Sequence, residues 1–115
     1  MLNIAVLLFA LAAAGGLLLA TLHFRGKDRP WPLAILHGLL AATGLVILLV
    51  AVAGGKSPEH AKLALILFLV AAVGGFLLFA FHLQKKTLPS LVVVIHAGVA
   101  VAAFLILGAA VYLGK

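Results

Sequence analysis

Hydrophobic residues fill four long runs of this sequence, and polar residues gather in short segments between them. Each run has about 20 residues, enough for a helix to span the ~30 Å hydrocarbon core of a bilayer. The pattern therefore predicts four transmembrane helices, at about 3–24, 30–53, 58–83 and 89–113. A membrane-spanning chain must satisfy its backbone polar groups internally, so we expect an all-α four-helix bundle.

Prolines, glycines and a serine mark the expected helix ends. Pro30 and Pro32 suit the first turn of the second helix, where a missing N–H has no consequence. The Gly-Gly pair at 54–55 is expected to end that helix. Ser57 is the predicted N-cap of the third helix, with Pro58 at its first helical position.

The second half of the chain repeats the first. Residues 1–56 align on residues 60–115 without a gap. The informative matches are those of Gly, His, Pro and Lys: Gly15-Gly16 with Gly74-Gly75, His23 with His82, Lys27 with Lys86, Pro30 with Pro89, His37 with His96, and Gly55-Lys56 with Gly114-Lys115. We interpret the chain as one membrane domain of two tandem helical hairpins. Hairpins of equal orientation are related by a parallel pseudo-twofold axis along the membrane normal.

Composition excludes a water-soluble domain. The chain is 67% hydrophobic and only 9% charged, with a mean hydropathy of +1.41, whereas soluble domains have roughly a quarter of their residues charged. The absence of cysteine excludes disulfides and thiolate metal sites. The formal net charge is +6, but the cations flank the apolar runs instead of forming a basic face, so we expect no nucleic-acid binding.

The distribution of cations predicts the orientation in the membrane. Five lie in the two turns that follow His23 and His82: Arg25, Lys27, Arg29, Lys85 and Lys86. Three lie on the other side: Lys56, Lys62 and Lys115. This bias favours turns in the cytoplasm and both termini in the periplasm or exterior, as for a multi-pass protein of a bacterial inner membrane.

No carboxylate lies within a predicted span, because the only acidic residues, Asp28 and Glu59, are in turns. The usual site for coupling to protons or cations is therefore missing. Histidines remain, and ionisable residues inside a membrane usually mark a function. His37 and His96 each lie seven residues beyond a proline, about 10 Å into their helices.

The other three histidines lie nearer the membrane surface. His23 and His82 come at the ends of the first and third runs, where interfacial solvation or a contact with a loop carbonyl would also explain them. His60 is at a helix start and is expected to be solvated. A single histidine is easily explained, but two repeated pairs favour a shared role.

Small residues share the helix faces of the four repeated histidines. They are Ala41 and Gly44 after His37, Ala100 and Ala103 after His96, Gly16 before His23, and Gly75 before His82. Small residues beside an imidazole leave room for a flat macrocycle, although close helix packing explains them equally well.

With these histidines and their small neighbours, the chain resembles the small four-helix membrane b-type cytochromes, in which two histidines ligate a haem. The resemblance implies haem b, one or two, in an electron-transfer protein or subunit that exchanges electrons with quinone and is not a stand-alone enzyme. His37 and His96 are the expected axial ligands. His23 and His82 would then lie near the propionates or ligate a second haem. The candidates for pairing with propionates are Arg25, Lys27, Lys85 and Lys86.

The chain departs from two-haem bundles in one respect. Each helix carries a single membrane histidine, and both pairs lie in the cytoplasmic half, so two haems stacked on the bundle axis would collide. Two other functions stay open. Four imidazoles could bind or transport zinc or copper, although the depth difference between the pairs disfavours one tetrahedral site. The chain could also be a structural or assembly subunit of a larger membrane complex, or a homo-oligomer.

Overall fold

The computed structural model describes residues 1–114, which form four α-helices and no strand. The helices are α1 (Leu2–Phe24), α2 (Trp31–Ala53), α3 (His60–Leu83) and α4 (Ser90–Leu113). All four are long and apolar enough to cross a membrane, which indicates a multi-pass membrane protein. Lys115, which the repeat pairs with Lys56, lies outside the described residues.

Prolines precede the starts of α2 and α4, and a glycine pair follows the end of α2, close to the predicted positions. Pro30 and Pro89 are N-cap residues in extended conformation, one position before α2 and α4, and Pro32 lies in the first turn of α2. Gly54 is the C-cap of α2, and Gly55 follows it with φ +72°. An extended N-cap is the conformation that proline adopts readily, so each proline starts its helix from outside.

The start of α3 differs from the prediction. The helix begins at His60 with Glu59 as its N-cap, so the predicted Ser57 cap and Pro58 start are wrong. The amide of Ala61 bonds to the carbonyl of Pro58 at 3.0 Å, three residues back. This i→i+3 bond makes a tighter turn ahead of the α-helix and moves the α-helical start by two residues.

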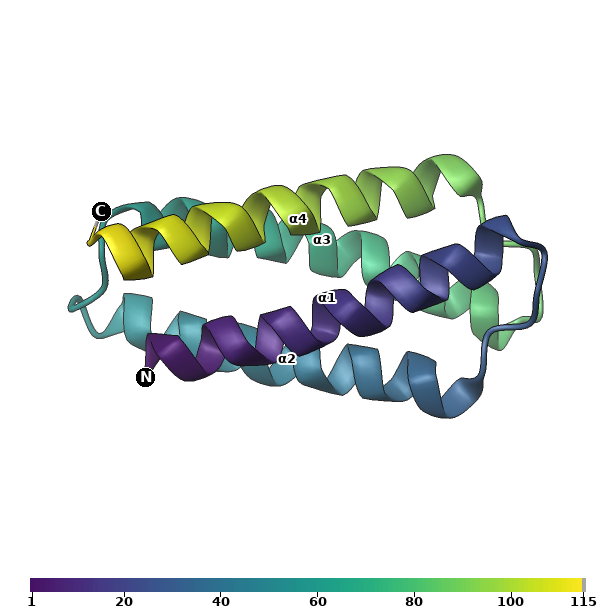
Figure 1. The fold of residues 1–115 in the computed structure, drawn as a ribbon, viewed down its shortest axis with the longest axis horizontal. Coiled ribbons are helices and arrows are strands. Elements are labelled where there is room, and N and C mark those ends of the chain that lie inside the picture. The colour runs from purple at the N-terminus through teal and green to yellow at the C-terminus, as the bar shows by residue number, and fades with distance from the viewer. Residues whose placement is uncertain (115) are drawn as a thin grey trace.

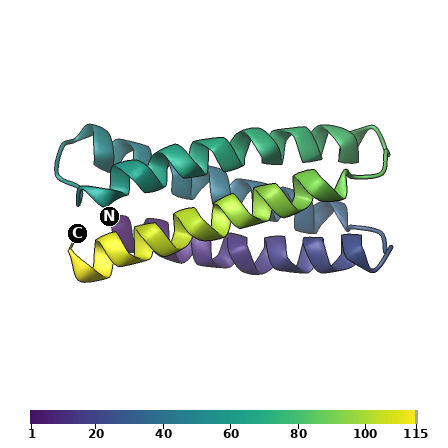
Figure 2. The same ribbon diagram turned by 90° about the horizontal axis from the view of Figure 1, so that it is seen from above.

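The four helices run alternately up and down, and both chain ends lie at one end of the bundle (Figure 1). α1 packs mainly against α2, and α3 packs mainly against α4. Smaller contacts join α1 to α4 and α2 to α3. α1 and α3 therefore occupy one diagonal, and α2 and α4 the other (Figure 2). We call the end with linker 54–59 the terminus end, and the end with linkers 25–30 and 84–89 the loop end.

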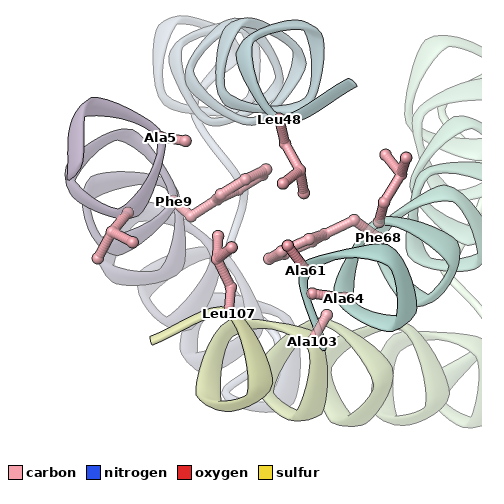
Figure 3. Packing of buried hydrophobic residues seen from close by; sticks show 10 residues of the cluster. Ala5, Phe9, Leu48, Ala61, Ala64, Phe68, Ala103 and Leu107 are labelled. Carbon is pink, nitrogen blue, oxygen red and sulfur yellow. The ribbon is translucent and has the colours of Figure 1, made fainter. Parts of the chain in front are cut away.

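The packed core lies in the terminus-end half. Phe9 of α1 and Phe68 of α3 stack across the bundle axis, with ring centroids 3.8 Å apart and an interplanar angle of 6° (Figure 3). Leu48 and Leu107 are fully buried around this pair. The cluster also contains four alanines with no exposed surface, which let the helices approach closely: Ala5, Ala61, Ala64 and Ala103. Lipid is as apolar as these side chains, so close packing rather than transfer from water stabilises this core.

Burial decreases toward the loop end. Residues 13–43 include no buried residue, and residues 72–102 include only Leu88 and Val93. The outer surface is apolar throughout, with Phe76 and Val73 among the most exposed side chains at 74% and 70%. This surface suits contact with lipid, and the contrast in interior packing distinguishes the two ends of the bundle.

The two linkers at the loop end begin with the same backbone turn. The amide of Lys27 bonds to the carbonyl of Leu22 at 2.9 Å, and Gly26 between them has φ +68°. At the end of α3, Lys86 bonds to Phe81 at 3.0 Å, and Lys85 has φ +55°. Both are Schellman motifs, which end a helix through one left-handed residue.

Candidate functional site

The imidazoles of His37 and His96 face each other across the bundle from the diagonal helices α2 and α4. Each histidine lies six positions after the first residue of its helix, Trp31 or Ser90. Their ring centroids are 6.4 Å apart, and their planes are nearly perpendicular, at 87°. Both residues are half-buried. The structure thus brings together the two histidines predicted to lie deepest.

A backbone carbonyl orients each imidazole through Nδ1. His37 Nδ1 lies 2.7 Å from the carbonyl oxygen of Ala12, and His96 Nδ1 lies 2.7 Å from that of Ala71. A carbonyl oxygen only accepts, so Nδ1 carries the proton and donates in both cases. With Nδ1 bonded to a carbonyl, Nε2 is the ring nitrogen that remains for a ligand. Neither Nε2 atom has a hydrogen-bond partner among residues 1–114, and both retain accessible surface.

Glycine pairs on α1 and α3 make room for the two rings. A Cβ built on Gly16 would lie 2.8 Å from Cε1 of His37, and one on Gly75 would lie 3.1 Å from Cε1 of His96. A Cβ built on Gly15 would lie 3.6 Å from the β-carbon of His37, and one on Gly74 would lie 3.4 Å from that of His96. The Gly-Gly pairs therefore accept the imidazoles of His37 and His96. Sequence reasoning had placed Gly16 and Gly75 beside His23 and His82.

The small residues on α2 and α4 lie at two levels. Ala41 and Ala100, one turn beyond the histidines, are half-buried. Gly44 and Ala103, two turns beyond, are buried. A Cβ built on Gly44 would lie 3.2 Å from three ring carbons of Phe9, so Gly44 makes room for that ring.

Each outer histidine, His23 or His82, contacts the opposite hairpin, and the two have different kinds of partner. Nε2 of His23 lies 3.0 Å from the hydroxyl of Ser90 at the start of α4. His82 instead packs edge-to-face on Trp31 at the start of α2, with centroids 4.7 Å apart, and stacks with Phe79 at 6.4 Å. No group of three or more His, Asp or Glu side chains among residues 1–114 could hold a metal ion. The four repeated imidazoles therefore do not form one multidentate site.

Cations surround the loop end, close to the histidine-bearing half. The four predicted to pair with propionates are all exposed in the linkers or helix ends: Arg25, Lys27, Lys85 and Lys86. A fifth, Arg29, is half-buried, and its Nε is buried with no hydrogen-bond partner. Sequence reasoning used Arg29 only as a topogenic charge. The one available signal was its departure from the repeat, which has Leu88 at the equivalent position.

Sequence reasoning also missed the carbonyl partners of the histidines and the Phe9–Phe68 stack. No sequence pattern marks a particular carbonyl, since every residue has one. The phenylalanines could have been found, because Phe68 follows Phe9 at the repeat offset. No protein-family model, curated protein or solved structure matches the chain.

Proposed function

We propose that the protein is a membrane-embedded haem b electron-transfer protein or subunit, with His37 and His96 as the axial ligands. The observation that carries the proposal is the central pair itself. Two imidazoles from diagonal helices face each other, each with Nδ1 bonded to a carbonyl and Nε2 without a partner in residues 1–114. Haem iron requires only two protein ligands, and facing helices of a bundle commonly provide them.

The residues present suit such a group in three ways. Histidines that ligate metals usually donate the other ring N–H to a carbonyl or carboxylate, as both do here to Ala12 and Ala71. Two imidazoles that would hold one iron must lie close together, because bonds from histidine nitrogen to a metal are only about 2.0–2.1 Å long. The observed separation is 6.4 Å. The third point is that no residue in 13–43 is buried, so the side chains of the first hairpin around the pair keep accessible surface.

The chain's own residues have distinct parts in this function. His37 and His96 would bind the haem iron, and the carbonyls of Ala12 and Ala71 fix the orientation of the two imidazoles. The Phe9–Phe68 layer closes the terminus-end side against water. A bound haem b supplies one-electron transfer, and its quinone or protein partner would exchange electrons from the membrane.

A bare transition-metal site receives less support. Structural and catalytic zinc sites use three or four protein ligands, and no three His, Asp or Glu side chains come together within residues 1–114. A structural or assembly role is the second candidate. The bonds from His37 to Ala12 and from His96 to Ala71 tie the two helices of each hairpin together, which a subunit of a larger complex or a homo-oligomer would also require.

The finer architecture belongs to the same proposal. We infer that two tandem hairpins are related by a twofold axis along the membrane normal. Contacts at equivalent positions support it: both central histidines bond to carbonyls at 2.7 Å, 25 positions away. The cation bias favours linkers 25–30 and 84–89 in the cytoplasm of a bacterial inner membrane and both termini outside. A reporter fused after Lys115 should be active outside the cytoplasm, and activity only in the cytoplasm would refute this orientation.

The decisive experiment is an absorption spectrum of the detergent-purified protein, oxidised and dithionite-reduced. We expect a Soret band and a low-spin spectrum. His37→Ala and His96→Ala should each abolish the low-spin spectrum, because each removes one axial ligand, whereas His60→Ala should leave it unchanged. Loss of the spectrum in His23→Ala but not in His37→Ala would assign the ligands to the outer pair. A wild-type protein without a Soret band would leave the structural role as the better candidate.

A further inference from the structure

Arg29 stands apart from the other polar side chains of the bundle. Its Nε is the only buried side-chain nitrogen or oxygen without a hydrogen-bond partner among residues 1–114. The neighbouring Asp28 is exposed, and no ion pair joins it to Arg29 within the described residues. A buried donor without a partner is unfavourable, and more so when it belongs to a charged group. Arg29 as a whole is only half-buried, so an acceptor from outside the chain can approach the rest of its guanidinium.

An aromatic cluster follows Arg29 closely in the chain, at the junction of the two hairpins. Trp31 begins α2 two positions after Arg29, and it packs edge-to-face on His82 of α3. Phe79, one turn before His82, contacts the same indole with centroids 5.8 Å apart. Trp31 and His82 thus bring two further polar groups, the indole N–H and the imidazole, to the contact that follows Arg29 in the chain.

The second hairpin has no such cluster. Leu88 stands at the position equivalent to Arg29 and is buried, at 8% exposure. Ser90 stands at the position equivalent to Trp31 and contacts His23. The fold therefore accepts an apolar side chain where the first hairpin has arginine. The guanidinium is not required to build the bundle, which favours a ligand-binding role.

We propose that Arg29, Trp31 and His82 form a binding site for an oxyanion, a phosphate or carboxylate group, at the loop end of the bundle. A guanidinium matches the geometry of such groups and forms strong charge-assisted hydrogen bonds with them. Lipid headgroups at a membrane surface carry phosphate groups, and basic sites between transmembrane helices bind anionic headgroups. The same chemistry also accepts free phosphate from the aqueous phase. The site does not depend on haem.

The chain provides its own reporter for this site, because Trp31 is the only tryptophan. The full chain is reconstituted in phosphatidylcholine nanodiscs, and Trp31 emission is followed in two series. One series increases the fraction of phosphatidylglycerol, and the other adds inorganic phosphate to pure phosphatidylcholine discs. A saturable change in the first series alone assigns the site to a lipid headgroup, and one in the second assigns it to a free oxyanion.

Two variants separate a specific site from general attraction between charges. Arg29→Leu and Arg25→Gln each remove one positive charge, and each introduces the residue of the second hairpin, Leu88 or Gln84. We expect Arg29→Leu to raise the amount of ligand at the titration midpoint by about tenfold or more, as for loss of one charge-assisted hydrogen bond. The midpoint of Arg25→Gln should stay within about twofold of the wild-type value, since a surface charge contributes little. Arg29→Lys keeps the charge but loses the planar fork, so it should also weaken binding.

Equal effects of Arg29→Leu and Arg25→Gln would overturn the proposal, as would a wild-type protein that responds to neither probe. Circular dichroism of both variants checks that the helices are retained. The readout requires no haem, so a negative result here leaves the axial-ligand proposal standing. A missing Soret band, in turn, leaves the oxyanion site standing.

Discussion

The two halves of the bundle place aromatic pairs on its axis in different ways. At the terminus end, Phe9 and Phe68 of α1 and α3 stack at 3.8 Å inside a layer of buried leucines and alanines. At the loop end, His37 and His96 of α2 and α4 face each other at 6.4 Å and are only half-buried. The first pair fills its level with dispersion contacts. The second pair is held by hydrogen bonds to carbonyls, with no residue in 13–43 fully buried around it.

This difference indicates that stability and function occupy different levels of one small bundle. In lipid, helix association depends on close packing and on hydrogen bonds between helices. The terminus end supplies the packing. The loop end contributes hydrogen bonds from His37 and His96, and these bonds also fix the orientation of the two imidazoles. Substitutions at the two levels should therefore have separable effects.

The largest expected effect on stability comes from Phe9→Ala. Loss of the stacked ring leaves a cavity beside Phe68, and we expect a decrease of about 3 kcal/mol in the free energy of unfolding. Under the haem proposal, the spectrum should not change, because the ring lies at the other level. Thermal unfolding in detergent micelles measures the loss. Phe76→Ala is the control, since that ring is 74% exposed; a similar loss in both variants would contradict a localised core.

Gly16→Ala is expected to have the next largest effect, and at the loop end. The new Cβ would lie 2.8 Å from Cε1 of His37, so the ring must move and its bond to Ala12 must break. We expect a loss of about 2 kcal/mol in unfolding free energy, within the usual range for overpacking. Under the haem proposal the low-spin spectrum should also be lost.

Two matched glycines test that explanation of the Gly16 effect. Gly75→Ala approaches His96 less closely, at 3.1 Å, and should therefore be milder. Gly15→Ala reaches only 3.6 Å from Cβ of His37, an ordinary contact, and should be mildest. A ranking that ignores these distances would show that the glycines do not position the imidazoles.

Gly44→Ala tests the terminus end more finely. Its Cβ would lie 3.2 Å from the ring of Phe9, so the ring must shift by a few tenths of an ångström. We expect a loss of about 1 kcal/mol, the lower end of the range for overpacking. The control is Gly38→Ala on the same helix, where nothing lies within 4 Å. Stability is again measured by thermal unfolding, and equal effects at both positions would exclude contact with Phe9 as the cause.

The smallest effect is expected where the two loop-end turns differ. Lys85 has φ +55° at the position where the first hairpin has Gly26. A left-handed conformation costs a non-glycine residue about 1 kcal/mol, so Lys85→Gly should raise the free energy of unfolding by up to that amount. The reciprocal Gly26→Lys should lower it similarly. Unfolding midpoints of both variants should therefore move in opposite directions, and a shift of the same sign in both would contradict the argument.

The sequence predicted the helices well because their ends are marked locally. The ends of α1, α2, α3 and α4 at Phe24, Ala53, Leu83 and Leu113 agree with the prediction. The start of α3 does not, because Pro58 begins a turn of i→i+3 bonds rather than the helix itself. Proline fixes only its own φ, so it marks the approach to a helix more reliably than the first α-helical hydrogen bond.

The site was predictable only in part. The repeat and the depth argument singled out His37 and His96, which the structure brings together. The partners of these histidines were not predictable. Each contacts a carbonyl 25 positions away and a glycine pair on the neighbouring helix. The same holds for Arg29, because no sequence pattern marks its Nε as buried.

The sequence by itself determined the all-helical membrane bundle, the number of helices and the level of each histidine. These properties follow from the length of each apolar run, its breakers and the 1.5 Å rise per residue. Only the tertiary structure decided which helix faces meet, and so which residues pack against Phe9, which carbonyls orient the imidazoles and where Arg29 is buried. The physical reason is that these helices are apolar around nearly their whole circumference. In such a helix the hydrophobic pattern does not distinguish the interior face from the lipid face, and rotation about the helix axis is settled by contacts between helices.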